Sequence, residues 1–164
     1  MRLETVFTCI RDKSETVGRI PIKLYRKNSD GTRTRIKSGR EYKIWTQEPN
    51  DYMGMTNFLE YLVQSCETTG AFYAYISENT RGNVMELIPL RYQQLVVPNM
   101  DLNGKVYYTY TTNDGKPSLT FGNDDLMIVK LTTTDGFTPV SPLSFNAGML
   151  NGTGGTDGTW HNFH

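Results

Sequence analysis

Residues 56–77, TNFLEYLVQSCETTGAFYAYIS, contain the change of hydrophobic period that decides the fold. Thr56 is a good helix N-cap, and after it the apolar residues recur at helical spacing on one face: Phe58, Leu59, Leu62, Val63 and Cys66. Gly70 stands where a helix commonly ends in a left-handed residue. From Ala71 to Ser77 the pattern changes to period two, which is typical of a strand. The stretch therefore predicts a helix that leads directly into a strand.

Downstream of this stretch, the sequence predicts further strands separated by short turns. Turn signals occur at Asn79–Asn83, Asn103-Gly104, Asp114-Gly115 and Gly122-Asn123. The strands expected between them cover 84–88, 92–97, 106–112, 118–121 and 126–131. Consecutive strands joined by short turns are antiparallel neighbours. We therefore predict an α+β fold in which an antiparallel β-meander sheet is packed by two helices.

Upstream, an apolar stripe from Leu3 to Val17 predicts the other helix, with Gly18 as its end. Residues 20–26 and 32–36 flank an Asn-Ser-Asp-Gly turn and predict a hairpin, and residues 38–55 are expected to be irregular. Near the other end, Ser141 precedes Pro142 as an N-cap precedes a first-turn proline. We predict one domain over 1–150 and a flexible, glycine-rich tail over 151–164.

The net charge of the chain is zero, but the charges are unevenly distributed. Residues 19–43 carry +7, and residues 48–86 carry −5. This asymmetry is consistent with a charged partner or with a head-to-tail contact between copies of the chain, but a solvated hairpin is the more common explanation of such a pattern. The candidate contact residues are in and after the second arm of the hairpin: Arg33, Arg35, Lys37 and Arg40.

The sequence offers little for catalysis, cofactors or metals. The histidines, His161 and His164, fall in the predicted tail, and no thiolate or carboxylate pair accompanies them, so we expect no metal site. Without a histidine in the body there is no Ser-His or Cys-His nucleophile arrangement, and we expect no enzyme. No apolar run approaches the roughly 20 residues of a membrane span. Cys9 and Cys66 are expected to be buried thiols in a reducing cytosol.

The sequence contains an ordered series of short landmarks. They are the Pro49-Asn50 pair, the capped helix at Thr56, the Gly70-Ala71-Phe72-Tyr73 entry to the sheet, and two proline sites, Leu87-Ile88-Pro89-Leu90 and Ser141-Pro142-Leu143. The opening of the chain is Val6-Phe7-Thr8-Cys9-Ile10 followed by Ile20-Pro21-Ile22. In this order, the opening and the landmarks resemble the front part of the bacteriophage portal protein family. Each landmark is a cap, a turn or a buried strand, so the resemblance concerns structure and involves no reactive group.

The resemblance implies the outer α+β wing of a portal, a subunit of a ring at one capsid vertex through which DNA is packaged and ejected. It implies no catalytic site and no cofactor. The implied partners are other portal subunits in a homo-oligomeric ring, with terminase and head-completion proteins docking on that ring. Double-stranded DNA would be contacted non-specifically at most, and no membrane is involved. The implied locations are the virion and the host bacterial cytoplasm.

The family continues after the Ser-Pro-Leu landmark into a long helix and a motor-docking region, for which this chain has little room. We therefore expect a truncated wing-like assembly module. Two alternatives remain open. One is a prophage-derived regulatory protein that joins full-length portal subunits and interferes with them. The other is a truncated remnant without a present role.

Overall fold

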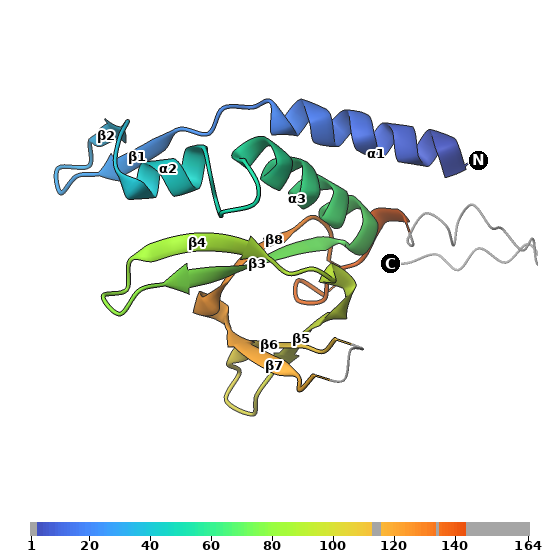
Figure 1. Ribbon diagram of the computed structural model, residues 1–164. Coiled ribbons are helices and arrows are strands. Elements are labelled where there is room, and N and C mark those ends of the chain that lie inside the picture. Colours follow the sequence, from blue (N-terminus) through green and yellow to red (C-terminus); the bar gives the residue numbers. More distant parts are fainter. Residues whose placement is uncertain (1–2, 113–115, 134, 144–164) are drawn as a thin grey trace, which may run out of the picture.

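Helices precede most of the strands along the chain, and the strands that come after them are antiparallel (Figure 1). The computed structural model describes residues 3–112, 116–133 and 135–143. The helices are α1 (Leu3–Gly18), α2 (Arg40–Thr46) and α3 (Met55–Thr69). The strands are β1 (Leu24–Lys27), β2 (Arg33–Ile36), β3 (Ala71–Glu78), β4 (Val84–Pro89), β5 (Val96–Met100), β6 (Val106–Tyr110), β7 (Leu119–Gly122) and β8 (Leu126–Lys130). Two short 3-10 turns, η1 (Gln93–Leu95) and η2 (Asn123–Asp125), precede β5 and β8.

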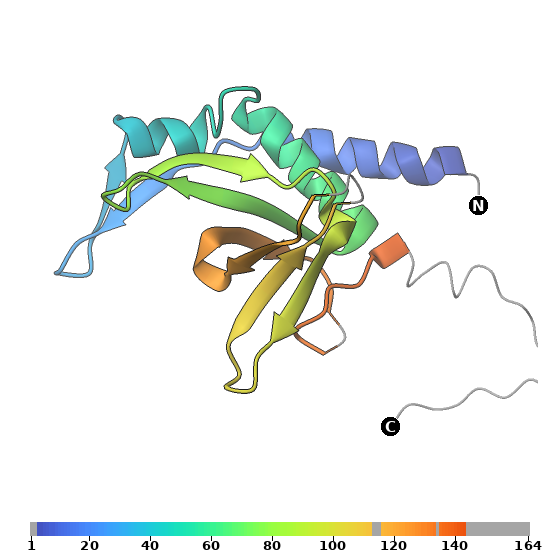
Figure 2. The same ribbon diagram turned by 60° about the horizontal axis from the view of Figure 1, so that its bottom comes forward.

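β3 is the central strand of the first sheet, whose order is β4-β3-β8. Its register pairs Ala74 with Pro89 on β4 and with Met127 on β8. A second sheet has the order β5-β6-β7, and β1 and β2 form a separate hairpin. Figures 1 and 2 show α3 along one side of the first sheet and the second sheet on the other side.

The two faces of β3 belong to two different hydrophobic cores because successive side chains of a strand point to opposite sides. Phe72 and Ala74 face α3 and pack with Phe58, Cys66 and Leu87. Tyr73 faces the second sheet and packs with residues of that side: Leu90, Val96, Tyr108, Tyr110 and Leu126. This is why the residues of β3 from Ala71 to Ala74 are all buried. β3 is thus the layer that the two cores share.

The predicted α+β class is confirmed, but the strands do not form a single meander. The strand after β4 starts a second sheet, and β8 returns to pair with β3 instead of with its predecessor.

The helices also differ from the prediction, because α2 lies in the stretch that the sequence predicted to be irregular. α3 begins at Met55 with Gly54 as its N-cap, two residues before the N-cap expected at Thr56. No helix in the described ranges is long and apolar enough to cross a membrane.

α1 packs along α3, and the two helices run side by side in both ribbon views. Lys13 and Glu67 form an ion pair across them at 2.9 Å, and Ser14 is buried between them. Of the predicted apolar stripe, Val6, Ile10 and Val17 are half-buried, whereas Phe7 is exposed. The expectation of two buried thiols is wrong for Cys9, which is exposed on α1, and right for Cys66. The predicted tail, 151–164, and its histidines lie outside the described residues.

Landmark residues and the candidate assembly surface

The Pro49-Asn50 landmark attaches the segment before α3 to the edge of the first sheet. Asn50 is only 7% exposed, and its Nδ2 donates to the carbonyl oxygen of Leu87 on β4 at 2.8 Å. Its Oδ1 accepts from the backbone N–H groups of Tyr52 (3.2 Å) and Met53 (3.0 Å). The carbonyl oxygen of Pro49 accepts from the Leu87 N–H at 2.7 Å. The landmark therefore supplies partners for the outer edge of β4, which would otherwise be left unpaired.

Gly70 lies where three segments meet. It is the left-handed C-cap of α3, with φ 87°, and its carbonyl oxygen accepts from the N–H of Leu131, just after β8. A Cβ at this position would collide with the backbone of Val140. Only glycine satisfies both conditions, because it tolerates positive φ and leaves room for the approaching chain. The Ser141-Pro142 landmark comes directly after Val140, and a helix begins at Pro142 as predicted.

Pro89 is the buried last residue of β4, and the chain leaves the sheet after it. The buried side chain of Gln93 then takes the place that a continuing strand would occupy. Its Oε1 accepts from the Tyr73 N–H at 2.7 Å, and its Nε2 donates to the carbonyl oxygens of Tyr73 (3.0 Å) and Leu90 (2.7 Å). Sequence reasoning missed this residue, which was expected to lie within a strand.

The candidate contact residues do not all share one face of the β1–β2 hairpin. Directly opposite residues of an antiparallel pair lie on the same face, so the pairs Tyr25–Arg35 and Lys27–Arg33 form one face. These four side chains are exposed, whereas Leu24 and Ile36 on the other face are half-buried. Lys37 comes directly after β2 and Arg40 opens α2, so both lie at the base of the hairpin.

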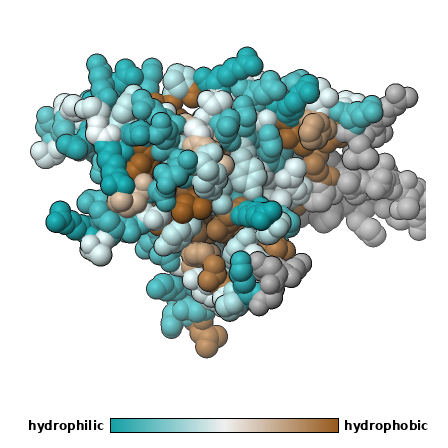
Figure 3. Space-filling view, in the orientation of Figure 1, coloured by the Kyte–Doolittle hydropathy of each residue, from teal (hydrophilic) through white to brown (hydrophobic). Residues whose placement is uncertain are grey.

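The basic residues of the hairpin take part in none of the ion pairs of the described residues, and the one acid of the hairpin, Asp30, accepts hydrogen bonds from Thr32 in the turn. The ion pairs there involve other bases, namely Arg11, Lys13, Arg19 and Lys43. The hairpin stands at one end of the molecule beside α2, and the visible surface there is hydrophilic (Figure 3). Its positive charge is therefore available to a partner.

The acidic residues of 48–86 are less available than the sequence suggested. Glu48 pairs with Lys43 at 2.6 Å, and Glu67 pairs with Lys13 at 2.9 Å. Glu60 and Glu86 are half-buried, which leaves Asp51 and Glu78 as exposed carboxylates outside the ion pairs of the described residues. The structure thus disperses the acidic charge while it concentrates the basic charge.

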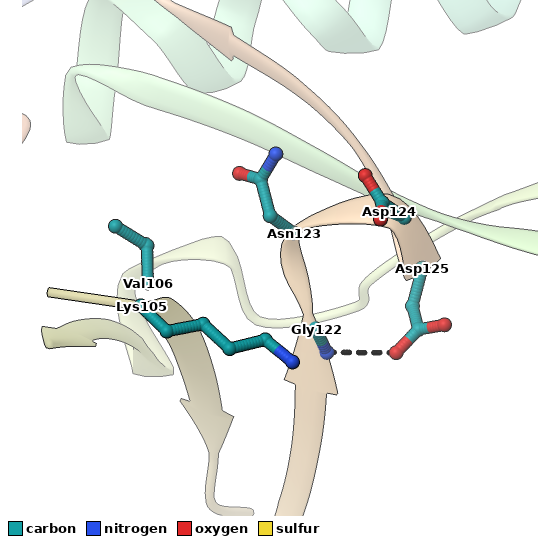
Figure 4. A pocket seen from close by; sticks show the side chains of 6 residues that line it. All are labelled: Lys105, Val106, Gly122, Asn123, Asp124 and Asp125. Carbon is teal, nitrogen blue, oxygen red and sulfur yellow. Dashed lines mark hydrogen bonds between the residues drawn. The ribbon is translucent and has the colours of Figure 1, made fainter. Parts of the chain in front are cut away.

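One open pocket of about 490 Å³ contains both acids and a base (Figure 4). It lies between β6 and η2 and is lined by Lys105, Val106, Gly122, Asn123, Asp124 and Asp125. Asp125 Oδ2 accepts a hydrogen bond from the Gly122 N–H at 2.7 Å, so this carboxylate stabilises the η2 turn. The carboxylates of Asp124 and Asp125 point in different directions, and they do not form a shared proton or metal site. Among the described residues, no cluster of three His, Cys, Asp or Glu side chains could hold a metal ion.

The perturbed titrations reflect burial and turn geometry. Burial raises the pKa of the Cys66 thiol to about 11 and that of the Tyr73 hydroxyl to about 12. Backbone N–H groups of Thr138 and Phe137 lower the pKa of Asp135 to about 2. These groups lie in separate parts of the fold, in the α3 core, the second core and the loop after β8. They do not converge on one site of acid–base chemistry.

Comparison with known proteins shows which protein family the chain belongs to. The family model described as "Phage portal protein" matches residues 4–159, which include every landmark. The chain belongs to the phage portal protein family. Membership in this family makes the chain a portal structural component, which agrees with the role of Asn50 and Gly70 in holding segments together.

Two curated relatives match parts of the portal-family chain. Protein BeeE of Escherichia coli (strain K12) is 38% identical over 90 residues, covering 55% of this chain and 56% of that protein. The portal protein of Enterobacteria phage HK97 is 24% identical over 149 residues, covering 88% of this chain and 34% of that protein. The matched region therefore corresponds to about half of one relative and a third of the other.

Solved structures share the portal-family fold. A chain in the neck of an empty gene transfer agent particle, computed with C6 symmetry, has a TM-score of 0.68 at 18% identity. It is matched over 95% of this chain and 44% of that chain. A chain in the neck of a native particle of the same kind, computed with C12 symmetry, has a TM-score of 0.65 at 17% identity over 95% and 42% of the two chains.

Proposed function

We propose that this chain acts as a non-catalytic, wing-like assembly module of a portal ring at a capsid vertex. The observation that carries the proposal is the family match over residues 4–159, to which the shared fold adds support. The Pro49-Asn50 pair and Gly70 each hold two or three segments in place, as a rigid assembly module requires. The module acts through shape and subunit contact and uses no cofactor.

The neighbour contact that we propose uses the basic residues of the hairpin and its base, Arg33, Arg35, Lys37 and Arg40. Their exposure and their absence from the ion pairs of the described residues support this assignment. The complementary carboxylates on the next copy would be the exposed Asp51 and Glu78. A basic patch that meets a different, acidic patch is a heterologous contact, and such contacts form a ring when the rotation from one copy to the next closes.

Light scattering of the full chain at high concentration tests this proposal. At low salt we expect oligomers larger than a dimer, and they should dissociate as salt shortens the Debye length to about 8 Å near 0.15 M. The R33E/R35E variant should shift the equilibrium towards monomer. The R81E/K105E variant has the same change of charge at exposed sites elsewhere and should assemble normally. A strict monomer at low salt would refute self-assembly by this chain.

The partners of the complete ring belong to the same proposal. Terminase and head-completion proteins would dock on the ring, and duplex DNA would pass through it without being read by sequence. The subunit would be present in the host bacterial cytoplasm before assembly and in the virion afterwards. If the chain instead joins full-length portal subunits and stops their rings from closing, mixing the two proteins will show co-migration together with incomplete rings. A chain that neither self-assembles nor co-migrates would favour the remnant alternative.

A further inference from the structure

The exposed face of the β1–β2 hairpin combines basic side chains with one aromatic ring. The strand register places two opposite pairs on this face, Tyr25–Arg35 and Lys27–Arg33. All four side chains are exposed, whereas the opposite face carries the half-buried residues of the hairpin. Strand alternation therefore gathers three bases around one tyrosine.

Two further bases stand at the open end of the hairpin. Lys23 directly precedes β1 and Lys37 directly follows β2, and both are exposed. The acid of the hairpin, Asp30, lies in the turn at the opposite end, where its carboxylate accepts hydrogen bonds from Thr32. At about 3.3 Å per residue, the distance from Lys23 to Lys27 is about 13 Å. We call the whole surface the basic face, which consists of Lys23, Tyr25, Lys27, Arg33, Arg35 and Lys37.

The basic face is accessible to a large partner. Figures 1 and 2 show the hairpin projecting at one end of the molecule, beside α2. The five bases of the face take part in none of the ion pairs of the described residues. The proposed contact with a neighbouring copy would bring only two carboxylates, those of Asp51 and Glu78. The face therefore suits a polyanion, in which negative charges follow one another along a chain.

The ring of Tyr25 indicates which polyanion this is. Tyr25 is 50% exposed, and its ring takes part in none of the aromatic or cation–π contacts among the described residues. A carboxylate offers no surface that stacks on such a ring, whereas an unpaired nucleobase does. Basic side chains that follow a phosphate backbone, together with an aromatic ring for the bases, are typical of sites for single-stranded nucleic acid.

We propose that the basic face binds single-stranded nucleic acid, with phosphates on its bases and a nucleobase stacked on Tyr25. Because every nucleobase has a π-face, binding should tolerate any sequence. This function is independent of the neighbour contact, although a bound strand would compete with the next copy for Arg33 and Arg35.

Fluorescence anisotropy tests the charge part of the proposal. The probe is a labelled oligothymidylate of about 20 nucleotides, titrated with the full chain below the concentration at which it assembles. Each phosphate neutralised on a single strand contributes about −0.7 to the slope of log affinity against log salt, so five bases predict about −3.5. The R33Q/R35Q variant should flatten this slope by about 1.4. The R81Q/K105Q variant removes the same charge from exposed sites elsewhere and should keep the wild-type slope.

The fold of the hairpin does not confound this comparison. R33Q/R35Q relieves the repulsion between Lys27 and the residue opposite it, so the substitution favours the paired strands. A weaker salt dependence in this variant therefore reports lost phosphate contacts.

Substitution of Tyr25 tests the stacking part separately from the charge. Tyr25→Ala should weaken binding about five-fold or more at constant salt, because one stacked base is lost, and should leave the salt slope unchanged. Tyr25→Phe keeps the ring and should bind within about two-fold of the wild type. Tyr52→Ala removes an exposed tyrosine outside the basic face and should have no effect.

No binding at low salt, an unchanged slope for R33Q/R35Q, or equal affinities of Tyr25→Ala and wild type would each overturn the proposal. Equal affinities together with competition by polyglutamate would assign the face to an acidic protein surface instead. An oligouridylate of the same length distinguishes RNA from DNA through its 2′-hydroxyls, and a preference for either supports the proposal. Binding by a chain that stays monomeric in light scattering would refute only the neighbour contact, and assembly without binding would refute only this inference.

Discussion

Two buried amide side chains provide hydrogen bonds that a sheet normally takes from backbone. Asn50 binds the outer edge of β4 and the turn before α3, and Gln93 binds both backbone groups of Tyr73. Each replaces water or a neighbouring strand at a position where a buried backbone group would otherwise be unpaired. Asn50 and Gln93 therefore stabilise the fold as hydrogen-bond partners of backbone groups.

Substitution of Asn50 should be costly although the residue is small and polar. Asn50→Ala removes three hydrogen bonds and leaves the buried carbonyl of Leu87 without its amide partner, so we expect a loss of about 2–3 kcal/mol in the free energy of unfolding. Urea denaturation monitored by circular dichroism measures it. Asn57→Ala, on the exposed side of α3, should change stability by less than about 0.5 kcal/mol. Equal effects of the two substitutions would contradict the role of Asn50.

Tyr73 places a buried hydroxyl in the second core, and this hydroxyl lowers the stability of the fold. It is 1% exposed, and its hydroxyl has no hydrogen-bond partner in the described residues. Tyr73→Phe should therefore raise stability at neutral pH, by about 1 kcal/mol.

The pH dependence of Tyr73 gives a second check. The pKa of its hydroxyl is raised from 10 to about 12 in the folded protein. The unfolded chain thus releases this proton first, and stability should decline between pH 10 and pH 12. Denaturant midpoints across this range should fall more steeply for the wild type than for Tyr73→Phe. Parallel curves would show that folding does not raise the pKa of this hydroxyl.

At the scale of elements, the β1–β2 hairpin is the least self-sufficient part of the described fold. It is a separate two-stranded sheet, and its exposed face sets Lys27 directly opposite Arg33. Like charges in opposite positions destabilise a strand pair. The hairpin therefore keeps a concentrated positive charge at the expense of its own stability.

Reversing one of these charges should strengthen the hairpin. Arg33→Glu converts the repulsion with Lys27 into attraction, and we expect a gain of about 0.5 kcal/mol in local stability. Amide exchange of Leu24–Lys27 at low salt measures it. Arg35→Glu makes the same change of charge opposite Tyr25 and should give a smaller gain. No difference between the variants would show that the opposite pair does not set hairpin stability.

At the scale of the whole molecule, β3 and the Gln93 turn join two sheets and two cores into one unit. Gln93→Leu keeps the size of the side chain but leaves the buried Tyr73 N–H without a partner, and it removes one of the two donors to the carbonyl oxygens of Tyr73 and Leu90. We expect a loss of about 3 kcal/mol and faster exchange in β5–β7 than in β4. Thermal unfolding and amide exchange test this.

The neighbouring residue supplies the matched control. Gln94 is exposed, and Gln94→Leu should leave both stability and exchange nearly unchanged. A Gln93→Leu variant that loses stability uniformly across both sheets would show that the turn does not connect them as a separate element.

The sequence alone determined the elements that depend on local periodicity and on local caps. α1, α3, β3 and the end of α3 at Gly70 result from spacing, from β propensity and from the tolerance of glycine for positive φ. The landmarks Pro49, Asn50, Gly70, Pro89 and Ser141-Pro142 identified the family because each is a cap, a turn or a strand end. Such features have local sequence signatures and can be recognised without the fold, although Asn50 and Gly70 act on residues far away in the sequence.

Only the tertiary structure decided how the strands were shared between sheets and which side chains acted across them. The pairing of β8 with β3, the role of Gln93 beside Tyr73 and the contact of Gly70 with Val140 join residues that are 20 or more positions apart. Strand alternation shows which residues share a face but does not name the neighbouring strand. The exposure of Phe7 likewise arises because α3 ends before reaching it, a fact of packing that the stripe of α1 does not contain.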